Sequence, residues 1–294
     1  MEKKALYGAI LSNIIFGLSF LFAKIALNTG IPPMILLAYR FLIAFIGMVL
    51  LLIFGKQKIN LKGKPLHILA GIILCQPLGY FIGESYGLLY TTSGFSSIMI
   101  ALIPIITLGG GALFLKEYPT KKQVFFSLVS IAGVLLLVIE ENTGGRVSMK
   151  GILFLSMAVL CAMGYNVISR YAGDTFTAFE RTFCMFLVGF IFYFTLGFQE
   201  AQWDIQELFS YLYPEVIIGV LYLAILSTIV SFFFMNVAFM YIPLAKLAVL
   251  GNLVPVISVI AGILILKEPA TFQVFLSLIL VIGGVIGVEI SDRH

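Results

Sequence analysis

Charge is the scarcest property of this sequence. Aspartate, glutamate, lysine and arginine make up 11% of its 294 residues, against 61% hydrophobic residues. Soluble domains carry roughly a quarter charged residues, and a soluble chain of this composition would leave much apolar surface facing water. The scarcity of charge therefore excludes an ordinary soluble protein and predicts an integral membrane protein.

Histidine, aspartate and cysteine are also scarce, which limits the available chemistry. The two histidines, His67 and His294, lie at a loop edge and at the C-terminal end, so a Ser–His dyad at membrane depth is excluded. The aspartates fall in loops or tails, which excludes a paired-aspartate protease (Asp174, Asp204 and Asp292). The cysteines have no spacing typical of disulfides or metal ligands (Cys75, Cys161 and Cys184). No H-E-x-x-H or G-x-x-x-x-G-K motif occurs, so we expect neither an enzyme nor a cofactor or metal.

Long apolar runs fill most of the chain. A hydrocarbon core about 30 Å thick needs roughly 20 apolar residues per crossing helix, and barrel strands would be shorter and alternate in polarity. Charged residues, glycines and prolines divide the chain into ten candidate spans: 6–27, 33–54, 66–88, 94–115, 122–139, 150–170, 177–198, 214–239, 245–266 and 271–290. The sequence therefore predicts an all-α integral membrane fold.

One segment occurs twice. Residues 104–120 read PIITLGGGALFLKEYPT, and residues 255–271 read PVISVIAGILILKEPAT. In both, a proline is followed twelve residues later by Lys-Glu, and a tyrosine (Tyr90 or Tyr241) stands fourteen residues before it. Two-fold repeats are how many transporters build a central site and alternate its access, so the repeat makes a transporter the first hypothesis.

The distribution of basic residues predicts how the repeats are oriented. With the N-terminus in the cytoplasm, most of the 18 lysines and arginines fall on the cytoplasmic side, as the positive-inside tendency requires. Both termini are then cytoplasmic. The first five spans, within residues 1–140, correspond to the last five, within residues 150–290. Because five is odd, the second repeat enters the membrane from the opposite side, which gives two inverted five-helix repeats.

These features resemble the drug/metabolite transporter superfamily, specifically its EamA-type members. The segments that carry the resemblance are Phe16-Gly17, Tyr39-Arg40-Phe41, and residues 86–92, 104–117 and 255–268. The resemblance implies a carrier of the cell inner membrane with a central cavity, often active in export, and amino acids or related compounds are the leading substrates. A drug efflux carrier and a flippase for an amphiphilic lipid-linked precursor stay open as alternatives.

The partners expected on this reading are few. They are a small-molecule substrate and the lipid bilayer, with protons as a candidate coupling ion. The lysines cluster beside apolar runs, where they report topology, so no nucleic-acid partner is expected. The choice between monomer and homodimer stays open. A channel would repeat charged rings or filter loops, which the sequence lacks.

The doubled prolines are candidate helix kinks. Pro104 and Pro255 lie near mid-membrane, and a proline frees the carbonyl four residues earlier, here those of Ile100 and Gly251. Such carbonyls could bind a substrate ammonium or hydroxyl, and Asn252 stands beside the second one. The alternative is a kink that only shapes packing.

Charged residues inside apolar runs are costly and usually have a partner or a function. Lys24, Arg40 and Glu84 all fall in the outer third of their spans. We predict Arg40 and Glu84 as a structural or gating pair, with direct substrate or proton binding by Glu84 as the alternative. Lys24 is a further gating candidate, or it extends to the interface as long basic side chains do.

Other polar and aromatic residues at membrane depth could line a cavity. These candidates are Asn13, Phe20, Tyr80, Tyr165 and Asn166. Three glycines of the third span, Gly79, Gly83 and Gly87, stand four residues apart, and such a stripe of small residues allows another helix to approach closely. We interpret the stripe as a packing surface, either within one chain or between two.

Overall fold

The computed structural model describes residues 2–55, 59–114, 116, 118–143, 147–172, 175–231, 234–235, 238, 250–251 and 253–291. All regular structure in these ranges is helical. The first half comprises α1 (Glu2–Asn28), α2 (Pro33–Phe54), α3 (Leu66–Ile73), η1 (Leu74–Gly79), α4 (Tyr80–Leu89), α5 (Ser93–Ile100), α6 (Ile103–Phe114) and α7 (Lys121–Thr143). The second half comprises α8 (Met149–Ala172), α9 (Ala178–Glu200), α10 (Ile205–Phe209), α11 (Pro214–Leu221), η3 (Tyr222–Val230), α14 (Leu253–Ile265) and α15 (Phe272–Ile290).

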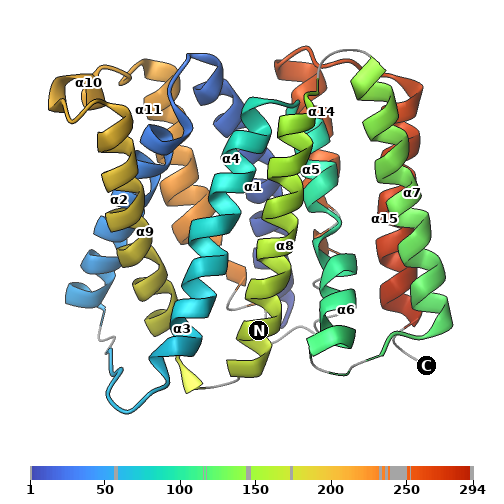
Figure 1. The fold of residues 1–294 in the computed structure, drawn as a ribbon, viewed down its shortest axis with the longest axis horizontal. Helices are drawn as coiled ribbons and strands as arrows, with labels where there is room; N and C mark the ends of the chain where they lie inside the picture. Colours follow the sequence, from blue (N-terminus) through green and yellow to red (C-terminus); the bar gives the residue numbers. More distant parts are fainter. Residues whose placement is uncertain are drawn as a thin grey trace.

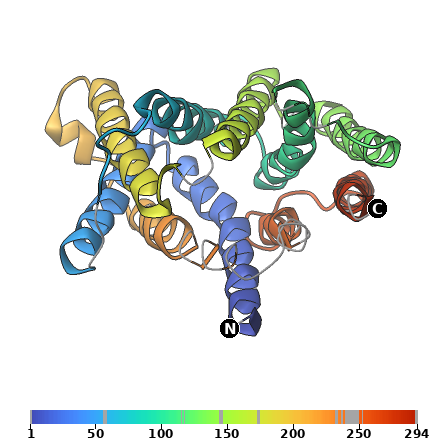
Figure 2. The same cartoon turned by 90° about the horizontal axis from the view of Figure 1, so that it is seen from below.

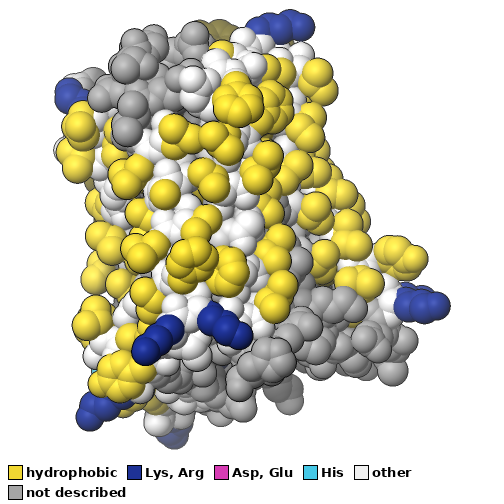
Figure 3. All heavy atoms as spheres, turned by 90° about the vertical axis from the view of Figure 1, so that its right-hand side faces the viewer, with side chains coloured by type: hydrophobic (Ala, Val, Ile, Leu, Met, Phe, Trp, Pro, Cys, Tyr) yellow, Lys and Arg dark blue, Asp and Glu magenta, His cyan; other side chains and the backbone are white. Residues whose placement is uncertain are grey.

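The helices are long and apolar enough for a multi-pass membrane protein. Six described segments meet the length and hydropathy of a membrane span: Lys3–Asn28, Pro33–Phe54, Leu66–Leu89, Ser93–Phe114, Met149–Ser169 and Phe179–Glu200. Shorter apolar helices cover Pro214–Val230, Leu253–Ile265 and Phe272–Val288. On the face formed by α7 and α15, hydrophobic side chains occupy the middle, whereas lysines and arginines lie at the two ends (Figure 3). This surface fits a lipid environment.

The two halves of the chain interleave. Seen from below, α1 lies between a group that contains α2, α9 and α11 and a group that contains α7, α8 and α15 (Figure 2). Helix α1 contacts α14, α11 and η3, while α2 packs on α9, α4 on α8, and α7 on α15. Each of these pairs joins a helix of the first half to one of the second, so neither half forms a separate body.

The glycine stripe explains one of these pairings. A Cβ atom on Gly83 would lie 2.5 Å from the carbonyl oxygen of Phe154, and one on Gly87 would lie 2.6 Å from the side chain of Leu155. Both contacts are with α8, which lies beside α4 in Figure 1. The predicted packing surface is confirmed, and its partner is a helix of the same chain.

The third predicted span is not one continuous helix. Gln76 has extended backbone angles (φ −145°, ψ 120°) inside η1, immediately before Pro77. Since proline removes a donor and collides with the preceding turn, the ladder of hydrogen bonds breaks here. The predicted span 66–88 agrees with the apolar segment Leu66–Leu89, which is long enough to cross a membrane, and the break at Gln76 and Pro77 lies within it.

The fourth predicted span is interrupted close to Pro104. The fourth span divides into α5 and α6 at residues 101–102, and Pro104 is the second residue of α6. Pro255 lies in the first turn of α14, with Gly251 just before it. Residues 239–249 and Asn252 lie outside the described residues.

Candidate functional site

A basic side chain caps the C-terminal end of α4. Lys24 on α1 donates from Nζ to the carbonyl oxygens of Leu88 (2.7 Å), Thr91 (2.5 Å) and, more weakly, Leu89 (3.4 Å). These carbonyls have no partner within the helix, and a cation is favoured at the negative end of the helix dipole. Lys24 therefore points into the protein, toward the turn between α4 and α5.

An acidic side chain caps the helix that follows. Glu268 accepts hydrogen bonds from the backbone N–H of Ser93 (2.7 Å) and Gly94 (3.1 Å) and from the Ser93 hydroxyl (2.9 Å). The Thr92 hydroxyl accepts from the Phe95 amide (3.1 Å) and completes the N-cap of α5. A carboxylate at this position compensates the positive end of the helix dipole. We name the set formed by Lys24, Glu268 and the α4–α5 turn (residues 90–92) the outer clamp.

The repeated Lys-Glu pair explains how Glu268 reaches α5. Lys267 has a left-handed backbone (φ 58°) that ends α14 and turns the chain back, so that the Glu268 amide donates to the Gly262 carbonyl (3.1 Å). Gly262 has no side chain to occupy the space that the Glu268 carboxylate and the Ser93 hydroxyl fill. Lys116, which stands at the corresponding position of the first repeat, has the same backbone conformation (φ 59°). Sequence reasoning singled out the repeated pair but missed its capping role.

A polar cavity adjoins the outer clamp. Its volume is about 390 Å³, and its lining combines two cationic side chains, one carboxylate, an amide and two hydroxyls. The lining residues are Lys24, Asn28, Thr91, Thr92, Leu266, Lys267, Glu268 and Pro269. Charges of both signs therefore face one small space at the end of the bundle that contains the α4–α5 turn.

The predicted pair of buried charges is present as a contact. Arg40 Nη1 lies 3.9 Å from Glu84 Oε2, and the Tyr80 hydroxyl donates to Glu84 Oε1 (2.9 Å). Arg40 also donates from Nε to the Thr228 hydroxyl (3.3 Å), and its guanidinium lies 4.5 Å from the centre of the Phe81 ring. The structure thus brings Arg40, Glu84 and Tyr80 together, while Lys24 makes its hydrogen bonds elsewhere.

The other candidate residues have various surroundings. Asn13 is buried and donates to the Ala9 carbonyl of its own helix (2.9 Å). Asn166 on α8 donates to the Thr107 hydroxyl on α6 (3.2 Å). The remaining candidates are placed by packing: Phe20 is in the core beside α2, and Tyr165 and Ile100 are partly buried against core clusters. A Cβ on Gly251 would meet no atom of the described part of the chain within 4 Å.

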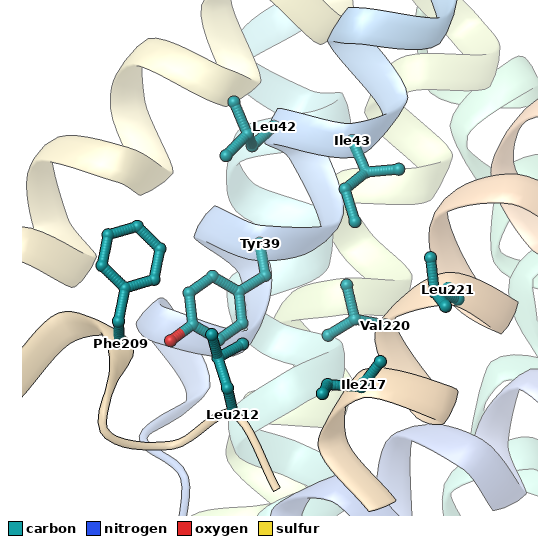
Figure 4. A pocket seen from close by; sticks show the side chains of 8 residues that line it. All are labelled: Tyr39, Leu42, Ile43, Phe209, Leu212, Ile217, Val220 and Leu221. Carbon is teal, nitrogen blue, oxygen red and sulfur yellow. The ribbon is translucent and has the colours of Figure 1, made fainter. Parts of the chain in front are cut away.

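A second, apolar cavity lies between α2 and α11. It has a volume of about 180 Å³ and is lined by Tyr39, Leu42, Ile43, Phe209, Leu212, Ile217, Val220 and Leu221 (Figure 4). The Tyr39 ring stacks on Phe209 with ring centres 6.2 Å apart, and its hydroxyl donates to the Leu208 carbonyl. This lining offers hydrocarbon contact and one hydroxyl that is already bonded.

Comparisons with known proteins agree with this architecture. The EamA-like transporter family model matches residues 3–139 and again residues 149–290. A Bacillus subtilis (strain 168) protein called "Uncharacterized transporter YcxC" is 31% identical over 294 residues, which are 99% of this chain and 94% of that protein. The "Probable amino-acid metabolite efflux pump" of Escherichia coli (strain K12) is 25% identical over 97% of this chain and 94% of its own. One solved crystal structure matches over all of both chains with a TM-score of 0.66 and 17% identity, which is a likeness of fold alone.

Proposed function

The chain belongs to the EamA-like transporter family of the drug/metabolite transporter superfamily, and we propose that it is a secondary transporter of the cell inner membrane that exports amino acids or related small metabolites. The observation that carries the proposal is the repeated proline and Lys-Glu segment, whose two Lys residues share one backbone conformation. Repeats of this kind let the two halves of a carrier open a central site to each side in turn.

The contacts between helices support ten spans in two inverted repeats. If the five spans of each half correspond in order, α2 pairs with its counterpart α9, and α7 with its counterpart α15. The contact of α1 with α14 then corresponds to that of α8 with α6, and the contact of α4 with α8 to that of η3 with α1. A two-fold axis that exchanges the halves produces this pattern. Alternating access would follow from rocking one half against the other.

The positions of the chain ends support the proposed orientation. The first residues of α1 and the last of α15 lie at the same end of the bundle (Figure 1), as an even number of crossings requires. Helices α1, α3 and α7 begin at that end (Figure 1), and lysines stand in their first turn or just before it (Lys3, Lys62, Lys64 and Lys121). By the positive-inside tendency this end is cytoplasmic, and the outer clamp lies at the opposite end.

The substrate class rests on two observations. The E. coli relative is named as an amino-acid metabolite efflux pump, and the cavity at the outer end has charges of both signs, which suit a zwitterion. The apolar cavity of Figure 4 favours the alternative of an amphiphilic, lipid-linked substrate. At about 180 Å³ it holds only part of an acyl chain, so we place amino acids first.

Efflux from proteoliposomes tests the proposal. Vesicles that contain the full chain are loaded with amino acids and common metabolites, and the loss of each is followed by mass spectrometry with and without a pH gradient. We expect selective loss of amino acids compared with protein-free vesicles. Uniform retention of every compound, with the protein folded and inserted, would contradict the proposal. Movement of a labelled lipid-linked precursor instead would favour the flippase alternative.

A further inference from the structure

The turn between α4 and α5 brings two helix ends of opposite polarity together. The C-terminal carbonyls of α4 carry partial negative charge, and the N-terminal amides of α5 carry partial positive charge. Lys24 binds the first set and Glu268 binds the second. Because Lys24 belongs to α1 and Glu268 follows α14, the two charges tie one turn of the third and fourth spans to the first and ninth.

Below this turn lies a layer of buried hydroxyl groups. Ser96 and Ser97 on α5 and Ser258 on α14 have no exposed surface. The Ser258 hydroxyl donates to the Ser93 carbonyl (3.2 Å), and that of Ser96 lies 2.7 Å from the Thr91 hydroxyl. Small hydroxyl residues let membrane helices pack closely, and the same hydroxyls would line a polar path if α5 and α14 moved apart.

The outer clamp separates this hydroxyl layer from the polar cavity of about 390 Å³. The cavity side is lined by Lys24, Lys267 and Glu268, while the hydroxyl layer has no exposed surface. Neither charge of the clamp has an oppositely charged side chain within ion-pair distance among the described residues. Their hydrogen bonds are to backbone groups at the α4–α5 turn and to the Ser93 hydroxyl, so among the described residues the turn can be released without breaking a salt bridge.

We propose that the outer clamp is the external gate of the transporter, and that release of the α4–α5 turn from Lys24 and Glu268 opens the hydroxyl layer to the outside. This inference rests on the proposed transport function and orientation. In this gate Glu268 reaches α5 because Gly262 leaves space for its carboxylate and because the left-handed backbone of Lys267 turns the chain back.

Thiol labelling tests the gate without any substrate. In the full chain the three cysteines are replaced by alanine, and Ser97→Cys places a reporter one helical turn below the capped end of α5. A membrane-impermeant maleimide is added to right-side-out vesicles. We expect K24M and E268Q each to increase the labelling rate about tenfold, because each removes charge-assisted hydrogen bonds that hold the turn. The double variant K24M/E268Q should be labelled little faster than either single variant, because both charges hold the same turn.

Matched controls use exposed charges at the same end of the bundle. Lys150 and Glu215 are both exposed, so K150M and E215Q should leave the labelling rate unchanged. K24R keeps the charge and should label more slowly than K24M, which separates gating from a folding defect.

Three outcomes would overturn the gate. The first is a labelling rate in right-side-out vesicles that stays unchanged in folded K24M and E268Q. The second is an equal increase of the labelling rate in the two controls, K150M and E215Q. The third is an increase of the labelling rate that is seen only in inverted vesicles. If external labelling rises as expected but no amino acid is transported by the parent protein, the gate stands and the proposed substrate fails.

Discussion

The hydroxyl of Tyr193 on α9 donates to the carbonyl oxygens of Pro77 (3.0 Å) and Leu78 (2.7 Å) on the third span. These carbonyls lie where the extended residue Gln76 interrupts the helix. Buried backbone groups are nearly always hydrogen-bonded, and a side chain from the other half of the chain adds a donor here, beside the Tyr80 amide that bonds the Pro77 carbonyl. The Tyr193 hydroxyl therefore ties α9 to the break in the third span.

Removal of this hydroxyl should destabilise the protein. Tyr193 has no exposed surface, so Y193F removes a buried hydrogen-bond donor from these carbonyls, at a cost of about 1 kcal/mol. Unfolding in mixed micelles, followed by circular dichroism, measures the loss. Y171F is the control, because Tyr171 is 73% exposed, and we expect a change within about 0.5 kcal/mol there. Equal stability of the two variants would show that the hydroxyl contributes nothing.

Close approach of α4 and α8 gives a second prediction. A methyl group at Gly83 would lie 2.5 Å from the Phe154 carbonyl and 2.7 Å from the Ala158 amide. Backbone atoms cannot move aside cheaply, so G83A should cost about 1–3 kcal/mol of stability. A methyl at Gly109 on α6 meets no atom of the described residues within 4 Å, and G109A should be neutral or stabilise by about 0.5–1 kcal/mol through helix propensity. The same unfolding measurement compares them, and a G83A protein as stable as G109A would contradict the packing.

The elements that the sequence predicted well are those set by local composition. The second predicted span, 33–54, has the bounds of α2, because a proline begins it and a glycine ends it. The pairing of Arg40 with Glu84 was predictable because two opposite charges in hydrocarbon have few other partners.

The partners of Lys24 could not be predicted from the sequence. It binds backbone carbonyls, and every residue has a carbonyl, so no residue type marks the site. Glu268 was visible as part of a repeat, but its contact with α5 depends on the turn at Lys267. The signal for a capping role is that Glu268 and the start of α5 both fall in turns at the same end of the bundle.

Proton coupling gives a third prediction. Glu84 is the carboxylate enclosed with Arg40 and Tyr80, and its 3.9 Å separation from Arg40 is too long for a hydrogen bond. E84Q can keep the contact with Tyr80 but cannot bind and release a proton. We therefore expect the variant to transport at one rate with and without a pH gradient, in the proteoliposome assay described above.

The control for this prediction is E215Q, which changes an exposed carboxylate at the start of α11. It should keep the response of the parent protein to the gradient. An E84Q protein that still responds to the gradient as the parent does would remove Glu84 from the coupling mechanism.

Gly262 gives the last prediction, which concerns the outer clamp. An alanine methyl there would occupy the space of the Glu268 carboxylate and the Ser93 hydroxyl. The carboxylate is the far end of a flexible side chain, so it can swing away while the helices stay packed. G262A should therefore fold normally and yet label at the Ser97→Cys reporter about tenfold faster, as E268Q does. Combining G262A with E268Q should give no further increase, because both changes remove the same cap. If the two increases multiplied, Gly262 would act through a contact other than Glu268.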